Sequence, residues 1–292
     1  MADLENQVPA GDATVFRIAS LTKPITATAA MQLAERGKLD LDAPVQRYVP
    51  EFPAKQWPLT VRHLLAHSGG VRNYRGTEET ITRHYSRLAD ALSIFGGDPL
   101  EFEPGTKVSY STWGYVLLGC AIEAASGMTY AEYVKHNIFE RAGMDRTFVD
   151  DPGAIVPGRA RGYVLRDGEV RNCAFADSSH KISAGGFVAS AGDMARFAVA
   201  LLAGKLVSQA DLDAMWSPYR LSGGKESPGG LGWGVFVRNG VREVGHSGQQ
   251  QGATSYLLVR RDKGNAIVVL TNLENPDGID LLAARVLAAV AR

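Results

Sequence analysis

The periodicity of the apolar residues changes after Gly229, and this change limits the folds open to the chain. From Ser20 to Arg141, apolar residues recur mostly at three- and four-residue spacing, which is typical of helices. After Gly229, short stretches bounded by turn residues predict an antiparallel meander. A final apolar stripe over residues 279–290 is suited to covering one face of that sheet. This order predicts an α+β protein with a helical lobe inserted in a sheet lobe.

Most of the predicted elements end at glycine or another turn residue. The predicted helices cover residues 20–36, 60–66, 78–95, 113–125, 130–141, 191–203, 209–216 and 279–290. The predicted strands cover residues 233–238, 241–244, 253–259 and 266–271, with a type I′ turn at Asn239-Gly240 and a short hairpin at Asp167-Gly168. We expect residues 1–19 and 186–292 to form the sheet lobe and residues 20–185 the mainly helical lobe, with the site between them.

The composition narrows the classes of partner. With 292 residues, of which 45% are hydrophobic and 21% charged, the chain can bury the core of a globular enzyme. Basic and acidic residues both total 31, so no excess of charge indicates binding to nucleic acid or to an anionic membrane surface. No apolar run reaches the roughly 20 residues of a membrane span, and the first residues lack the pattern of a signal peptide. We therefore expect a cytoplasmic protein as written, and leave open whether a longer parent is exported.

Metal and nucleotide chemistry find no support in the motifs. Cys120 and Cys173 have no metal-ligand spacing, and Cys120 lies in an apolar helical pattern typical of a core residue. The chain has no His-Glu-x-x-His and no glycine-rich phosphate loop, and its six histidines are scattered. We expect no metal and no cofactor.

Ser20 and Lys23 stand where a helix is predicted to begin. Pro24 has no N–H group and is tolerated in the first turn of a helix, so the helix starts near Ser20, and Gly37 ends it. The serine hydroxyl then lies one turn from the lysine amine, at the positive end of the helix dipole. This arrangement suits acyl transfer with Ser20 as the nucleophile.

The spacing Ser-x-x-Lys is weak by itself, because the chain contains it three times. The pairs Ser178–Lys181 and Ser222–Lys225 lie in polar or glycine-rich stretches that indicate loops. Only Ser20 opens a strongly patterned helix, although a plain N-cap serine is an alternative interpretation there.

Two further segments can complete the site. Tyr110 lies between a turn at residues 103–105 and the helix that begins at Trp113, where its phenol could exchange a proton with Ser20. A tyrosine that serves only packing is the alternative. The segment 244–249 ends one strand and offers backbone N–H groups along which an acyl group could align.

Two other serine or histidine motifs are set aside. Gly245-His246-Ser247-Gly248 resembles the start of a G-x-S-x-G elbow, but residue 249 is Gln and the strand-to-helix turn is missing, so we reject Ser247 as the nucleophile. The segment His67-Ser68-Gly69 follows the helix 60–66, and we interpret it as the C-terminal cap of that helix rather than as part of a site.

These elements, in this order, resemble the serine β-lactamase and penicillin-binding-protein superfamily, of which Ser-x-x-Lys is a signature. The closer similarity is to its class C branch, which includes family VIII carboxylesterases, D-aminopeptidases and the mitochondrial β-lactamase-like serine protease of animals. It implies a β-lactamase/transpeptidase-like fold, in which an antiparallel sheet is flanked by helices and joined to a mainly helical lobe. The residues that carry the resemblance are 20–23, 110–112 and 246–248, supported by 37–42, 60–70, 102–105 and 117–119.

The resemblance also implies roles for single residues. Ser20 would be the acyl-accepting nucleophile, and Lys23 and Tyr110 would be the proton-transfer pair, with the choice of base left open. Either base would need a pKa about three units below its ordinary value to act near neutral pH. The N–H groups of Ser20 and Gln249 would form the oxyanion hole. The residues implied to face substrate are Thr112, His246, Ser247 and Gly248.

Departures from the superfamily pattern guide the expected substrate. β-Lactamases of this branch usually have Asn where this chain has Thr112 and Lys where it has His246. A hydroxyl makes a less directed contact than an amide, and a neutral histidine lacks the charge that attracts a β-lactam carboxylate. Gln249, where relatives have Gly, could narrow the acyl pocket. We therefore expect a small ester or amide substrate, with at most weak β-lactam hydrolysis.

A larger departure lies at the start of the sequence. Members of the superfamily normally have a helix and a strand hairpin before the Ser-x-x-Lys helix, and those strands would pair beside residues 266–271. We expect the strand at residues 266–271 to form an open edge of the sheet, which favours a homo-oligomer or a less stable fold.

Three functions from different classes stay open at this point. The first is a serine hydrolase that forms an acyl-Ser20 intermediate on esters or small amides or peptides. The second is a penicillin-recognising binder or sensor that is acylated without turnover. The third is an assembly-forming protein on a β-lactamase-like scaffold. The presence of Ser20, Lys23 and Tyr110 together favours the first.

Overall fold

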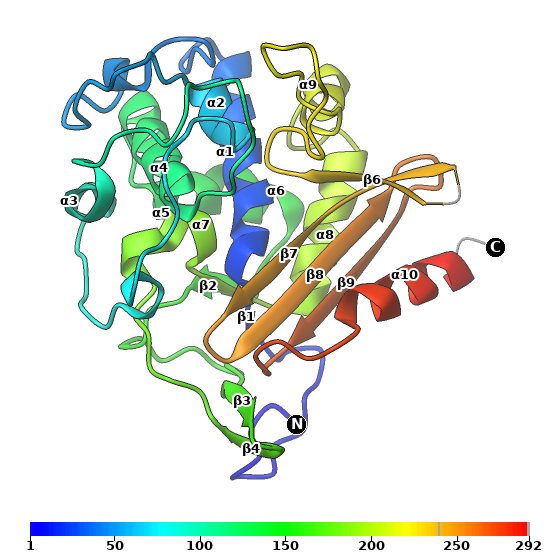
Figure 1. Cartoon of the computed structure of the whole chain (residues 1–292). Helices are drawn as coiled ribbons and strands as arrows, with labels where there is room; N and C mark the ends of the chain where they lie inside the picture. The colour runs from blue at the N-terminus through cyan, green and yellow to red at the C-terminus, as the bar shows by residue number, and fades with distance from the viewer. Residues whose placement is uncertain (239, 291–292) are drawn as a thin grey trace.

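The computed structural model describes residues 1–238 and 240–290 (Figure 1). Its main sheet is an antiparallel meander in the order β6-β7-β8-β9, as the strand pattern predicts. The predicted turn at Asn239-Gly240 includes Asn239, which lies outside the described residues. The four strands are β6 Gly234–Arg238, β7 Val241–Gln250, β8 Ala253–Arg260 and β9 Asn265–Thr271.

Two smaller sheets accompany the meander. The first has the order β1-β5-β2. The second is the hairpin β3-β4, which the sequence predicts at Asp167-Gly168 and whose two turn residues both have positive φ. Separately, the division of the chain into two lobes at residues 19/20 and 185/186 stays a prediction. The strands of the smaller sheets are β1 Phe16–Arg17, β2 Thr147–Val149, β3 Tyr163–Arg166, β4 Glu169–Asn172 and β5 Phe187–Ala189.

Helices cover both faces of the meander and fill the other half of the molecule (Figure 1). The α-helices are α1 Thr22–Glu35, α2 Val61–Leu65, α3 Leu92–Phe95, α4 Thr112–Ser126, α5 Tyr130–Val134, α6 Glu140–Ala142, α7 Ile182–Gly185, α8 Ala191–Leu202, α9 Gln209–Met215 and α10 Ile279–Val290. The 3₁₀ turns are η1 Ala19–Leu21, η2 Val45–Arg47, η3 Glu78–Thr80, η4 Leu88–Ala91 and η6 Ser179–Lys181, and η5 Lys135–Phe139 is a π-helical turn between α5 and α6.

Side chains of β8 alternate between two apolar layers. Leu257 and Val259 belong to the large core that contains α1, α4 and α8, whereas Tyr256 and Leu258 pack with Ala283 of α10. This alternation follows from the two-residue period of a strand, which sends successive side chains to opposite faces. The sheet is therefore buried on both faces, as the apolar stripe of residues 279–290 predicted.

The first helix begins as predicted. The turn η1 contains Ser20 and leads directly into α1, where Pro24 is the third residue. Gly37 follows the helix with a φ of +65°, a left-handed conformation that glycine adopts without steric cost. Every residue of α1 from Thr22 to Leu33 is buried, so this helix forms the centre of the molecule.

The predicted helix over residues 78–95 is wrong. Only the short turns η3 and η4 and the helix α3 form there. The backbone between them bonds to another segment instead of to itself: Asp177 N–H donates to the Ile81 carbonyl, and Tyr85 N–H donates to Ser179 Oγ. Tertiary hydrogen bonds therefore replace the helical ones that the apolar periodicity predicted.

The predicted strand 241–244 is too short, because β7 continues to Gln250. Its second half has no β-branched residue, and its polar and glycine residues resemble a loop. The backbone nevertheless pairs with β8 along its whole length, from Val244 opposite Val259 to Gln250 opposite Ala253. This extension carries the segment 246–249 past the start of α1.

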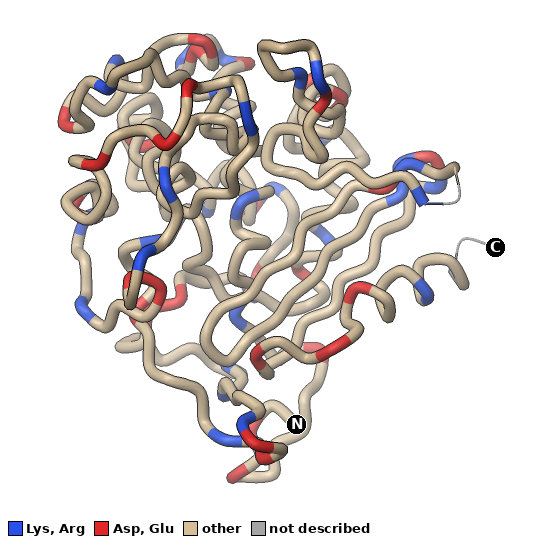
Figure 2. Tube along the Cα trace, viewed as in Figure 1, with Lys and Arg blue, Asp and Glu red and all other residues tan. Residues whose placement is uncertain are grey.

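The strand β9 is an edge of the main sheet among the described residues, as predicted. Beside it, α10 presents three apolar side chains that are between 40% and 52% exposed, namely Leu281, Leu282 and Val286. Within residues 1–238 and 240–290, no helix is long and apolar enough to cross a membrane. Figure 2 shows basic and acidic residues distributed over the whole trace, while the middle of β7 and β8 carries few of either.

Candidate active site

Ser20, Lys23 and Tyr110 converge at one point, although Tyr110 lies 90 residues away in the sequence. Ser20 Oγ accepts a hydrogen bond from Lys23 Nζ at 2.9 Å and another from the Tyr110 hydroxyl at 2.9 Å. Ser20 Oγ makes no helix-capping bond, and neither η1 nor α1 has a side-chain cap, so the N-cap interpretation of Ser20 is wrong. The hydroxyl faces an amine and a phenol, which are groups that can move its proton.

Lys23 is enclosed by protein. Its side chain is fully buried, and Nζ also donates to the Ala184 carbonyl at 2.8 Å. Burial lowers the pKa of Lys23 well below its ordinary value, and the positive charge of Lys181 lowers it further. These surroundings therefore favour the neutral amine of Lys23, which has a free lone pair, over the charged form.

Tyr110 has the opposite character. It is partly exposed at the edge of the site, yet desolvation of its hydroxyl raises the pKa of Tyr110 above 10, against a smaller lowering by the hydrogen bond with Ser20. The phenol therefore keeps its proton near neutral pH and acts as a hydrogen-bond donor. Of the two bases that the sequence left open, these surroundings favour Lys23.

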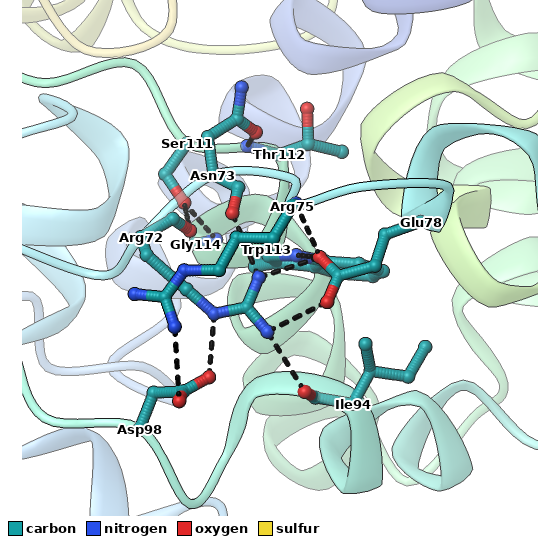
Figure 3. A network of polar contacts seen from close by, with 10 residues as sticks. All are labelled: Arg72, Asn73, Arg75, Glu78, Ile94, Asp98, Ser111, Thr112, Trp113 and Gly114. Carbon is teal, nitrogen blue, oxygen red and sulfur yellow. Dashed lines mark hydrogen bonds and ion pairs between the residues drawn. The ribbon is translucent and has the colours of Figure 1, made fainter.

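A buried arginine holds the loop that is hydrogen-bonded to Ser111 and Thr112 (Figure 3). Arg72 is 4% exposed and forms ion pairs with Glu78 and Asp98, each with a closest N–O distance of 2.6 Å. Its carbonyl accepts a hydrogen bond from Ser111 Oγ at 2.8 Å, and Glu78 accepts one from Trp113 Nε1 at 3.2 Å. The loop that begins at Arg72 is thereby fixed to the residues that follow Tyr110.

The strand β7 touches the backbone of Ser20. A Cβ atom on Gly248 would lie 2.9 Å from Ser20 N and 2.5 Å from the Ile18 carbonyl oxygen, so only glycine fits there. The Ile18 carbonyl also accepts a hydrogen bond from Ser255 Oγ of β8 at 2.7 Å. These contacts dock the start of α1 on the sheet.

The same strand supplies a candidate oxyanion hole. Pairs in an antiparallel ladder alternate between hydrogen-bonded and non-bonded, and the two-residue turn after Gln250 closes on a bonded pair with Ala253. The N–H of Gln249 therefore points away from β8, toward the side that β6 leaves free beyond Gly245. The first N–H groups of a helix lack intrahelical partners, which makes the N–H of Ser20 a second donor.

Backbone strain is present directly before the nucleophile. Ala19 has a φ of +47°, a left-handed conformation that costs a residue with a Cβ atom about 1–3 kcal/mol. The surrounding bonds impose it, because Ile18 N–H donates to the Phe187 carbonyl while Leu21 N–H closes the turn on the Ile18 carbonyl. Strain of this kind is often found at functional sites.

A pocket of about 240 Å³ opens next to Tyr110 and is lined by His67, His246 and Ser247 among others. Burial lowers the pKa of His246 to about 4, and the charge on Lys23 contributes to the same shift. His246 is therefore neutral at pH 7, as the substrate argument assumed. Its Nδ1 lies 2.6 Å from the Ser247 carbonyl oxygen, which fixes the ring.

Thr112 and Gly248, implied to face substrate, and Gln249, implied for the oxyanion hole, do not line that pocket. Thr112 is 5% exposed, begins α4, and donates its N–H to Asn73 Oδ1 at 3.0 Å. The side chain of Gln249 is exposed on β7. Their contact with substrate stays a prediction.

Sequence reasoning missed His67, which lies against Tyr110, and Lys181, whose charge acts on Lys23. His67 contributes to the end of α2, since its N–H donates to the Leu64 carbonyl, but its ring also lies 4.4 Å from the ring of Tyr110. Lys181, from a pair interpreted as a loop, lies in η6 and is 3% exposed, with its Nζ 5.8 Å from the ring centre of Tyr74. The recurring Ser-x-x-Lys spacing gave no signal of this burial.

No group of three or more His, Cys, Asp or Glu side chains in the described part of the chain is arranged to hold a metal ion. Cys120 is buried in α4, in agreement with its interpretation as a core residue.

Several known proteins are similar to this chain over most of its length. The mouse (Mus musculus) mitochondrial serine beta-lactamase-like protein LACTB is 29% identical over 95% of this chain and 69% of its own length. The chain spans between 64% and 69% of the length of the LACTB proteins of mouse, human and cattle.

Two solved structures are similar across nearly the whole chain. The D-amino acid amidase of Ochrobactrum anthropi SV3, complexed with D-phenylalanine, superposes with a TM-score of 0.84 at 27% identity, covering 99% of this chain and 88% of the amidase. An octameric penicillin-binding protein homologue from Pyrococcus abyssi gives a TM-score of 0.84 at 29% identity, covering 99% and 68% of the two chains. The family model described as Beta-lactamase matches residues 1–292. This chain therefore belongs to the beta-lactamase family, with the β-lactamase/penicillin-binding-protein fold.

Proposed function

We propose that the protein is a serine hydrolase that forms an acyl-Ser20 intermediate on carboxylic esters or on small amides and peptides. One observation carries the proposal: Ser20 Oγ lies 2.9 Å from both a buried lysine amine and a tyrosine hydroxyl. A serine is a weak nucleophile until a neighbouring base accepts its proton, and this arrangement supplies that base.

Acylation begins with neutral Lys23. Its amine accepts the hydroxyl proton of Ser20 while Oγ forms a bond to the substrate carbonyl carbon, and the carbonyl oxygen takes the negative charge. The N–H groups of Ser20 and Gln249 stabilise that charge at the N-terminal end of α1. Loss of one such donor typically lowers the rate about 100- to 1,000-fold.

The intermediate then collapses. The bond from carbon to the leaving oxygen or nitrogen breaks, Tyr110 gives its proton to the leaving group, and Lys23 returns the proton it took to Tyr110. Water attacks the acyl-Ser20 ester by the same route in reverse, with Lys23 accepting the water proton and Ser20 recovering its own. Each proton taken is returned, so the cycle needs no cofactor.

Neutral surroundings favour uncharged leaving groups. His246 carries no charge at pH 7, and the pocket that it lines with Tyr110 offers no permanent cation for a β-lactam carboxylate. Small amides are included because the similar Ochrobactrum protein is a D-amino acid amidase. We therefore propose that ester or amide hydrolysis exceeds β-lactam hydrolysis.

A substrate screen tests the proposal. It uses 4-nitrophenyl esters of increasing chain length, D- and L-phenylalaninamide, and a chromogenic cephalosporin. We expect turnover of an ester or an amide, covalent labelling by a fluorophosphonate, and loss of both in Ser20→Ala. Ser222→Ala is the matched control, because Ser222 also opens a Ser-x-x-Lys pair but donates to the Gly105 carbonyl in a loop.

Three results would contradict the proposal. A preference for the cephalosporin would overturn the substrate class. A stoichiometric burst without turnover would indicate a penicillin-recognising binder. Unchanged behaviour of Ser20→Ala and Lys23→Ala would indicate an assembly protein on an inactive scaffold.

We further propose that the exposed side of β9 and α10 associates with a second copy of the chain. The edge strand and the half-exposed apolar side chains of α10 lie next to each other, and the similar Pyrococcus homologue is octameric. Edge strands and exposed apolar patches favour association.

A further inference from the structure

His67 brackets Tyr110 through the backbone. The residue before Tyr110, Ser109, donates its N–H to the His67 carbonyl at 2.9 Å. The residue after it, Ser111, donates its N–H to His67 Nδ1 at 3.2 Å. One residue thus accepts the N–H groups on both sides of Tyr110, which fixes the peptide planes that carry the phenol.

The ring of His67 also lies against the ring of Tyr110. The two ring centres are 4.4 Å apart, with an angle of 31° between the planes. The centre of the His67 ring also lies 4.8 Å from the centre of the Tyr115 ring. Tyr115 is fully buried, and its hydroxyl donates to the Leu65 carbonyl at 2.9 Å, so this neighbour is itself fixed to α2.

The imidazole is retained at a cost. Nδ1 accepts from Ser111, so a neutral ring carries its proton on Nε2, and Nε2 is buried without a hydrogen-bond partner in the described part of the chain. A buried donor without a partner lowers the stability of the fold. A phenyl ring would avoid that cost but could not accept the Ser111 N–H. His67 therefore combines a hydrogen-bond acceptor for Ser111 with a flat ring that packs against Tyr110.

The protonation state of the ring agrees with this use. Burial lowers the pKa of His67 well below its ordinary value, which favours the neutral ring that can accept the Ser111 N–H. The backbone at His67 is left-handed, with a φ of +53°, which turns the carbonyl toward Ser109 while the side chain faces Tyr110.

We propose that His67 is the positioning residue for Tyr110, which it holds at hydrogen-bond distance from Ser20 Oγ by binding both flanking N–H groups and by stacking on the phenol. This inference rests on the proposed function of Ser20. Within the described part of the chain, His67 forms no hydrogen bond with Ser20 or Lys23, so it acts through Tyr110.

Two variants separate the parts of this role. His67→Asn keeps an oxygen acceptor and tolerates the left-handed backbone, but it removes the ring. His67→Gly removes the acceptor and the ring without backbone strain. His63→Asn is the matched control, because His63 lies in α2 and accepts the Thr60 N–H but, among the described residues, forms no hydrogen bond with Ser109 or Ser111.

The readout is the single-turnover rate of acylation by 4-nitrophenyl acetate, divided by the fraction of enzyme that a fluorophosphonate labels. We expect His67→Gly to lower this rate about 100-fold with little change in KM, since misplacement of a reacting group by about 1 Å costs that much. His67→Asn should recover part of the loss. His63→Asn should keep the rate per labelled site even if its labelled fraction falls.

A double variant gives the decisive comparison. In Tyr110→Phe there is no hydroxyl to position, so adding His67→Gly should lower the rate by less than about threefold further. If the two losses multiply, or if the rate per labelled site is unchanged in both His67 variants, the positioning role is wrong. Failure of the proposed function is a separate result, because it would show as full activity in Ser20→Ala.

Discussion

The backbone nitrogen of Ser20 lies so close to Gly248 that a Cβ atom on Gly248 would be 2.9 Å from it. A contact of that length is shorter than side chains tolerate, so the two segments meet backbone against backbone. The nucleophile and the strand that would bind the acyl group are therefore positioned by the absence of a side chain.

We expect Gly248→Ala to lower kcat/KM for a 4-nitrophenyl ester about 100- to 1,000-fold. The added methyl group pushes β7 away from η1, which separates the N–H groups of Ser20 and Gln249 and removes one oxyanion donor. Gly223→Ala is the control, because a Cβ atom there would meet no atom within 4 Å. Activity of Gly248→Ala within threefold of the parent would contradict the proposed oxyanion hole.

The pH dependence of the reaction should follow Lys23. Burial and the charge of Lys181 lower the pKa of Lys23, so its neutral form dominates above a pH well below 10.5. Only the neutral amine can accept the Ser20 proton, so kcat/KM should rise with pH through the lowered pKa and reach a plateau well below pH 10.5. The profile of a 4-nitrophenyl ester against pH measures this. A rate that keeps rising up to about pH 10 would instead indicate a base with an ordinary lysine or tyrosine pKa.

Lys181→Met should move the acidic limb of that profile to higher pH. Burial lowers the pKa of Lys181 to about 8, so the side chain is charged at pH 7, and its charge is the second cause of the lowered pKa of Lys23. Removing the charge raises the pKa of Lys23, and more hydroxide is then needed to form the neutral amine. Lys181→Arg keeps the charge and should leave the limb in place. Equal profiles for all three proteins would show that burial alone sets the pKa of Lys23.

The sequence predicts the centre of the site because its signals are local. Pro24 and Gly37 mark the ends of the first helix, and the structure has Ser20 and Lys23 one turn apart where that helix begins. For Tyr110, which is 90 residues away from Ser20, the sequence offered only a position in a loop before a helix and the resemblance, and neither gives a distance. Roles for these residues stay predictions until activity is measured.

The predictions from sequence are wrong where tertiary contacts override local patterns. Residues 78–95 have helical periodicity, but Asp177 and Ser179 take the hydrogen bonds of this segment. The second half of β7 resembles a loop because Gly248 is needed for close approach to Ser20. His67 resembled a plain helix cap because its second contact, with Tyr110, joins segments that no local pattern connects.

Leu282→Glu should weaken self-association of the protein. Leu282 is 52% exposed on α10, beside the edge strand β9. Burial of a leucine side chain contributes about 1.5–3 kcal/mol, so a buried charge there should raise the dissociation constant at least about tenfold. Sedimentation velocity over a concentration series measures this, with Val199→Glu on α8 as the control, since Val199 is 57% exposed on another helix. A protein that is monomeric at every concentration before mutation would contradict association at this edge.

His246→Lys should shift preference toward β-lactams. The pKa of His246 is lowered to about 4, so at pH 7 the parent has no charge beside the pocket, whereas lysine adds one next to the expected place of a β-lactam carboxylate. A partly exposed ion pair contributes about 1 kcal/mol, which corresponds to about a fivefold gain in kcat/KM for a chromogenic cephalosporin relative to a neutral 4-nitrophenyl ester. His246→Met removes the imidazole without adding charge and should give no such gain. If the lysine variant changes both substrates by the same factor, the charge at position 246 does not select the substrate, and the acyl side of the site must set the preference instead.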